Sequence, residues 1–98
     1  MILGVSVCEL HLPSVRSLKG KRKIVKGLVE RIHHRYRVSI AETKYHDLHQ
    51  RAEISVAIVG NREQEVEELL ESVHRIFEAE TEAYITQWAP SLLLESSL

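Results

Sequence analysis

In the stretch AEISVAIVGNREQEVEELLESVHRIF, residues 52–77, the spacing of apolar residues changes from that of a strand to that of a helix. Residues 52–59 are apolar on both parities and rich in β-branched side chains, which predicts a strand. A Gly-Asn pair at 60–61 then breaks the pattern. From Val66 to Phe77 apolar residues recur at helical spacing, so the stretch predicts a strand followed directly by an amphipathic helix.

The flanking sequence predicts one more helix and three more strands. Residues 2–12 form an apolar run that ends at Pro13, which predicts a strand. Ser17 is expected to cap a helix whose apolar stripe extends from Val25 to Tyr36. Residues 38–43 and 83–88 are the other expected strands, and residues 91–98 have no expected element.

The order strand, helix, strand, strand, helix, strand predicts an α+β fold of the ferredoxin-like βαββαβ type. We expect a four-stranded antiparallel sheet with strands 2–12 and 52–59 in the centre and both helices on one face. The chain has 98 residues and 44% hydrophobic content, enough for one modest core. It is expected to form a single domain, residues 1–98, with a tail from about residue 90.

The predicted central strands are apolar on both faces, although two helices can cover only one of them. Ile2, Leu3, Val5 and Val7 show this in the first strand, and the third strand repeats it. Such strands are typical of sheets that are covered on both sides. We therefore expect either a second protomer, which would make the protein a homodimer, or the tail at residues 92–94 to cover the open face.

Composition predicts a cytoplasmic protein without a membrane partner. Cys8 is the single cysteine, so an internal disulfide is impossible. The N-terminus lacks the pattern of a secretory signal, and no apolar run is long enough to span a bilayer. The formal net charge of −1 argues against a general polyanion binder, so any role with phosphate must depend on a local patch.

Such a patch lies at the start of the first predicted helix. Residues 14–27, SVRSLKGKRKIVKG, contain six basic residues and no acidic one. Cations near a helix N-terminus are unfavourable, because that end carries the positive pole of the helix dipole. Gly20 and Gly27 are also unfavourable inside a helix. A bound anion would explain both features, since free N–H groups, the dipole and flanking cations make a phosphate site. The candidate nucleic-acid contacts are Arg16, Lys19, Lys21, Arg22, Lys23 and Lys26.

Two other interpretations of the basic residues stay open. Lys19, Lys23 and Lys26 fall opposite the apolar stripe, so they could be a solvated face that pairs with the acidic second helix. The cluster could also form a pocket for a phosphate ester. Arg22 and Lys21 precede Val25 by three and four positions, where the stripe should continue, which predicts that the helix start projects past the sheet.

Signals for metal binding and catalysis are weak. His46 and His49, with His33 and His34, could supply metal ligands, but their spacing is not specific for a metal site. Glu9 and His11 share a strand face and could form an acid–base pair, yet no nucleophile accompanies them. Phosphate-binding loops of the Walker and Rossmann types are absent. We expect no enzyme activity, no cofactor and no metal.

Three segments resemble the YlxP-like family of small uncharacterised bacterial proteins. They are GVSVCELHLPSVRSLKGKRKIVKGL, VSIAE and DLHQRAEISVAIVGN, and the similarity covers roughly residues 2–77. The resemblance implies a ferredoxin-like fold and no established activity. Genes of the family often neighbour those of translation initiation and ribosome maturation factors, which associates the family with the ribosome.

These observations predict a non-enzymatic protein that binds RNA or the ribosome through phosphate contacts of the basic cluster. RNA recognition would depend on backbone charge, because the two central strands contain no aromatic side chain for base stacking. One alternative is a homo-oligomeric interaction module whose basic and acidic helices pair between protomers. A second, weaker alternative is a small phosphate-ester or acyl-phosphate hydrolase.

Overall fold

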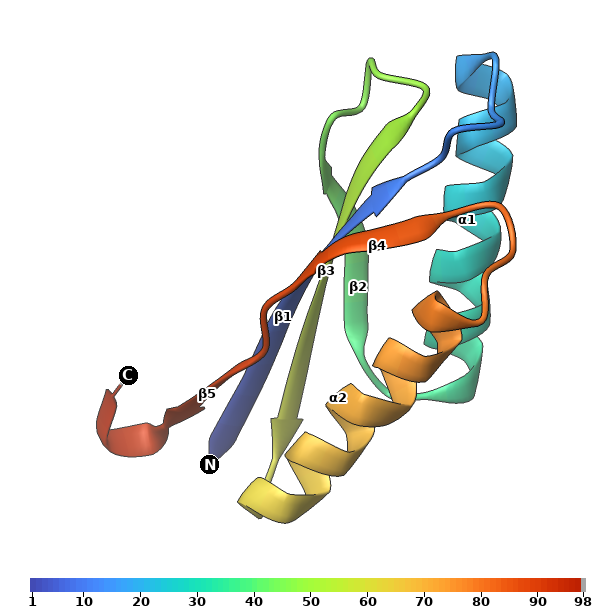
Figure 1. The fold of residues 1–98 in the computed structure, drawn as a ribbon. Coiled ribbons are helices and arrows are strands. Elements are labelled where there is room, and N and C mark those ends of the chain that lie inside the picture. The colour runs from blue at the N-terminus through green and yellow to red at the C-terminus, as the bar shows by residue number, and fades with distance from the viewer. Residues whose placement is uncertain (98) are drawn as a thin grey trace.

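The computed structural model describes residues 1–97 and shows a twisted antiparallel sheet with two long helices (Figure 1). The sheet order is β2-β3-β1-β4, with β1 and β3 in the centre. β4 pairs with the last residues of β1, and β5 pairs with its first residues. This arrangement confirms the ferredoxin-like prediction. The elements are β1 (Ile2–His11), α1 (Leu18–Arg35), β2 (Ser39–Lys44), β3 (Arg51–Gly60), α2 (Glu63–Glu78), β4 (Tyr84–Trp88), β5 (Ser91–Leu94) and a 3₁₀ turn (Glu95–Ser97).

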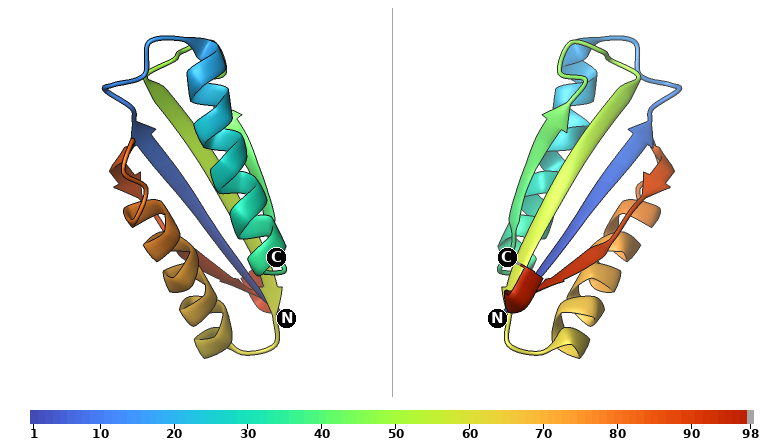
Figure 2. Two further views of the ribbon diagram at one scale, coloured as in Figure 1. Left: turned by 90° about the vertical axis from the view of Figure 1, so that its right-hand side faces the viewer. Right: turned by 90° about the vertical axis from the view of Figure 1, so that its left-hand side faces the viewer.

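Both helices lie on one face of the sheet, and the core fills the space between the two layers (Figure 2). Alternate residues of β1 and β3, such as Leu10 and Ile54, point into this layer and are fully buried. Cys8 belongs to the same row, and its burial raises the pKa of the thiol to about 12. The thiol therefore stays protonated at neutral pH and is an inert core residue.

The C-terminal segment adopts a structure that the sequence did not predict. β5 pairs antiparallel with the start of β1, with Leu93 opposite Leu3 and Leu92 opposite Gly4. Leu92 lies on the helix side, where its Cδ2 would be 3.5 Å from a Cβ added to Gly4. The segment thus extends the edge formed by β4, and the expectation that it folds over the open face is wrong.

The face of the sheet opposite the helices carries apolar side chains that no described residue covers. Val5 pairs with Ala57, and Leu3 pairs with Val59, whose exposed fraction is 70%. At the other end of this face, Arg51 Nη2 lies 3.1 Å from Glu9 Oε1. Within residues 1–97, no helix is long and apolar enough to cross a bilayer.

Candidate nucleic-acid interface

The N-terminus of α1 is capped as the sequence predicts. Ser17 has an extended backbone conformation, and its Oγ accepts a hydrogen bond from Gly20 N at 3.0 Å. The first turn contains no acidic residue that would complement the helix dipole. The basic residues around this turn therefore lie at a positive helix end without local compensation from a carboxylate.

Five of the six predicted contact residues are exposed around this end of the helix: Arg16, Lys19, Arg22, Lys23 and Lys26. Within the described residues, the first four have no carboxylate oxygen within 4.0 Å. Lys26 Nζ lies 3.9 Å from Glu30 Oε1, but both side chains are mostly exposed, so this pair is weak. The five side chains form an accessible basic surface, called the α1 basic surface below.

Lys21 does not belong to this surface, and its predicted role as a phosphate contact is corrected here. The residue is fully buried, and its Nζ lies 2.8 Å from Glu42 Oε2 and donates to Tyr45 O at 2.6 Å. Lys21 continues the apolar stripe of Val25 and Leu28 toward the sheet. Its ammonium is thus committed to the protein interior. The prediction that the start of the helix projects past the sheet is therefore wrong at this position.

The turn after β2 supplies the cover over Lys21. Tyr45 is the one described non-glycine residue with positive φ, at 66°. Its carbonyl accepts from both Lys21 Nζ and Leu48 N, the latter at 3.0 Å. Its ring lies under the Arg51 guanidinium, 4.0 Å from the ring centroid. These contacts hold Tyr45 in a sparsely populated conformation that directs its carbonyl toward the buried ammonium.

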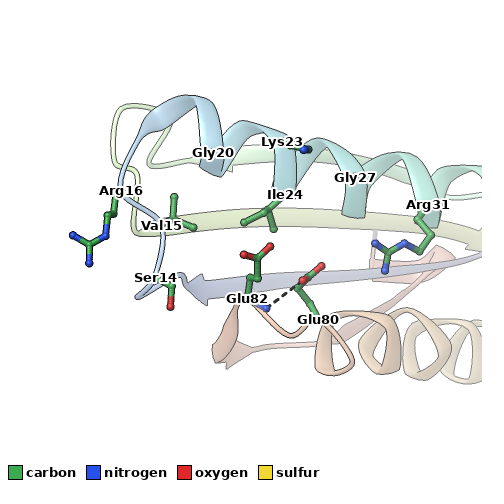
Figure 3. Close-up of a pocket in the computed structure, with 10 residues that line it drawn as sticks. All are labelled: Ser14, Val15, Arg16, Gly20, Lys23, Ile24, Gly27, Arg31, Glu80 and Glu82. Carbon is green, nitrogen blue, oxygen red and sulfur yellow. Dashed lines mark hydrogen bonds between the residues drawn. The ribbon is translucent and has the colours of Figure 1, made fainter.

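A groove of about 490 Å³ lies beside the α1 basic surface, between α1 and the segment that follows α2 (Figure 3). Gly20, Ile24, Gly27 and Arg31 line it from one face of α1. The other lining residues are Ser14, Val15, Arg16, Lys23, Glu80 and Glu82. The groove therefore combines cations on the helix side with two carboxylates on the opposite side.

Glycine keeps the helix side of this groove open. A Cβ added at Gly27 would meet no atom within 4 Å. A Cβ at Gly20 would lie 3.2 Å from Ser17 Oγ and 3.6 Å from Val15 Cγ1. Gly20 thus lies close to the capping contact, whereas Gly27 faces open space. The predicted role of glycine in close approach to the helix fits the position of Gly27.

Comparison with known families assigns the chain. A family model described as "Protein of unknown function (DUF503)" matches residues 3–89. The chain belongs to the DUF503 family. A curated relative, the uncharacterized protein YlxP of Bacillus subtilis (strain 168), is 30% identical over 91 residues, covering 89% of this chain and 99% of YlxP.

A solved structure similar to this DUF503 protein supports the fold alone. It is a de novo designed protein with a ferredoxin fold, with a TM-score of 0.52 and 16% sequence identity. The match covers 97% of this chain and 87% of the designed chain. No residue role follows from it, and the DUF503 family is itself one of unknown function.

Three charged residues of the groove were absent from the sequence-based site. Arg31 follows Gly20, Ile24 and Gly27 at helical spacing. This spacing places it on the same helix face, so it could have been predicted as part of the site. Glu80 and Glu82 follow the end of α2, where no periodic pattern fixes their direction. Their place opposite α1 depends on how the two helices pack on the sheet.

Two of the four candidate metal ligands, and both members of the Glu9–His11 pair, form hydrogen bonds within the protein. His46 Nε2 donates to Glu42 O at 3.1 Å, and His33 Nδ1 donates to Val38 O at 3.3 Å. Glu9 pairs with Arg51 as described above, while His11 Nδ1 donates to Gln50 O at 3.2 Å. These side chains serve the fold of this DUF503 protein at the turns and strand ends.

Proposed function

We propose that this DUF503 protein is a non-enzymatic cytoplasmic protein that binds RNA, either free or in the ribosome, through its α1 basic surface. The observation that carries the proposal is the group of four cations without carboxylate partners, Arg16, Lys19, Arg22 and Lys23, at the positive end of α1. They are unfavourable for helix stability. A polyanion bound there would turn the same charges into favourable contacts.

Pairing of the two helices within one chain accounts for the cluster less well. α2 is acidic in its first turn, at Glu63 and Glu65. The described residues nevertheless include no ion pair between α1 and α2. The cations of α1 therefore remain available to a ligand, and this favours the RNA proposal over an intramolecular role.

Recognition would use backbone charge more than base stacking. The central strands β1 and β3 contain no aromatic residue, so the sheet offers no stacking platform of the kind used by RNA-recognition motifs. Trp88 stacks on His74, with ring centroids 4.5 Å apart, and is therefore already occupied within the fold. Phosphate contacts of this kind make binding strongly dependent on salt.

A titration of isotope-labelled protein with a single-stranded RNA oligonucleotide tests where RNA binds. We expect the largest amide chemical-shift changes in residues 16–27, because phosphates would lie against these side chains. The same titration in high salt is the control, and there the changes should disappear. Changes confined to the open sheet face, or none with RNA in excess, would contradict the proposal.

We further propose that two copies associate through the open sheet face. Its centre is apolar at Val5, Val7 and Ala57. At its charged end Arg51 pairs with Glu9, and Glu53 accepts a hydrogen bond from Thr43 Oγ1 at 2.6 Å. Two such faces can stack with their apolar centres in contact. A second copy therefore fits this face as its partner.

Light scattering of wild type and Val5→Lys tests this association. We expect the wild type to have the mass of a dimer and Val5→Lys that of a folded monomer, because a charge in the centre of the interface would be buried without a partner. Gln64→Lys, with the same change on exposed α2 surface, should stay dimeric. A monomeric wild type at micromolar concentration would refute the dimer.

A further inference from the structure

Gly27 has no structural reason to be glycine. None of the glycines described has a positive φ, and a Cβ at position 27 would meet no atom within 4 Å. Glycine within a helix destabilises it by about 1 kcal/mol relative to alanine. The residue therefore lowers stability without easing strain or packing. Its one structural effect is the open groove beside Ile24 (Figure 3).

The basic and acidic residues that line the groove do not pair with one another. Arg16, Lys23 and Arg31 have no carboxylate oxygen within 4.0 Å among residues 1–97, although Glu80 and Glu82 line the same groove. Figure 3 shows both carboxylates directed toward α1, with Ile24 facing them. Glu80 Oε2 accepts from Glu82 N at 3.2 Å, which restrains the first carboxylate.

This combination of charges restricts the chemistry of a ligand. A bare phosphate would be repelled by the two carboxylates, and a simple cation would be repelled by the three basic groups. A ligand that fits must present an anion toward α1 and hydrogen-bond donors toward Glu80 and Glu82. A ribonucleotide does so, because its phosphate is anionic and its ribose hydroxyls are donors. The groove volume of about 490 Å³ lies in the range of small-ligand sites.

We infer that this groove binds one ribonucleotide unit, with its phosphate at Arg16 and Lys23 and its ribose 2′-hydroxyl donating a hydrogen bond to a carboxylate of the Glu80–Glu82 pair. The sugar lies over Gly27 and Ile24, where the absent side chain leaves room. This inference rests on the proposed function and deepens it. The 2′-hydroxyl distinguishes RNA from DNA, so Glu80 and Glu82 select RNA among the polyanions that the α1 basic surface attracts.

The test compares the affinities of RNA and DNA oligonucleotides of one sequence and length for wild type and Glu80→Ala/Glu82→Ala. We expect wild type to prefer RNA by about tenfold, the effect of one hydrogen bond to a charged group. The double variant should bind both equally, mainly because DNA binding improves when the carboxylates are removed. Glu67→Ala/Glu71→Ala removes the same charge from exposed α2 surface and should keep the preference.

A second variant blocks the groove without changing its charge. Gly27→Leu should fold, since leucine is a better helix former and open space surrounds the site. It is expected to abolish the RNA preference while salt-dependent binding to the basic surface persists. Adenosine 5′-monophosphate alone forms a further arm. If it shifts the groove amides as strongly as RNA does, the occupant is a free nucleotide, and otherwise it is a unit of an RNA chain.

The outcomes separate this inference from the proposed function. Binding of RNA and DNA with equal affinity by wild type would overturn the selective groove and leave the basic surface in place. A preference retained in Glu80→Ala/Glu82→Ala and in Gly27→Leu would overturn it as well. Failure of wild type to bind either oligonucleotide would overturn the proposed function itself.

Discussion

Replacing Lys21 with methionine is expected to lower the free energy of unfolding by about 3 kcal/mol. This value is the lower end of the range found when one partner of a buried ion pair is removed. The methionine side chain fills much of the same space, but Glu42 then keeps a charge without its partner, with its side chain only 17% exposed. In a domain of this size the melting temperature should fall by roughly 15 °C. Thermal and urea denaturation measure the effect.

Two further variants isolate the ion pair as the cause. Lys19→Met makes the same substitution on the exposed side of the same turn and should change stability by no more than about 0.5 kcal/mol. Lys21→Met/Glu42→Met removes both charges and should recover most of the loss, because Tyr45 O still accepts from Leu48 N. Equal stability of Lys21→Met and Lys19→Met would show that the buried contact is unimportant.

Removing the exposed charges should have the largest effect on RNA binding. A variant with glutamine at positions 16, 19, 22 and 23 keeps Lys21 and replaces each exposed cation by a neutral polar side chain. Its affinity for single-stranded RNA should fall on the order of 100-fold at low salt. Each phosphate contact that is lost no longer releases counterions from the RNA, and this release favours binding. Its stability should rise slightly, since the replaced cations oppose the dipole of α1.

A control variant with the same net charge distinguishes an RNA site on α1 from nonspecific electrostatic attraction between the protein and RNA. Four exposed cations elsewhere in the chain, Arg35, Arg37, Lys44 and Arg62, can be replaced by glutamine in a second variant. It has the same net charge as the first, so diffuse attraction should fall equally in both. We expect the control to lose much less affinity. Equal losses would mean that α1 holds no particular site.

The fold could be predicted from the sequence because the periodicities of its elements are clear. Residues 52–77 change from strand to helix within a few positions, and β3 and α2 follow that change closely. Apolar residues on both faces of the central strands also indicated that the sheet has an uncovered apolar face. β5 was missed because a run of three leucines after Pro90 fits a strand and an irregular tail equally well. Its pairing with the start of β1 decides between them.

The basic cluster was predictable in place but not in every member. Lys21 falls at i−4 from Val25 on the apolar stripe, a position that indicates burial, yet a lysine there also fits an exposed helix end. Lys21 is buried because the turn at Tyr45, which follows β2, covers this part of α1. Such a contact between distant segments depends on the length and shape of a turn, and no local pattern encodes it.

The salt dependence of RNA binding, measured for wild type and the four-glutamine variant, tests whether the α1 basic surface holds phosphates. For single-stranded RNA the slope of log K against log salt is about −0.7 for each phosphate contacted. Four lost contacts should therefore reduce the steepness of the slope by about 3. A wild-type slope near zero, or slopes equal in the two proteins, would contradict the claim that the α1 basic surface holds phosphates.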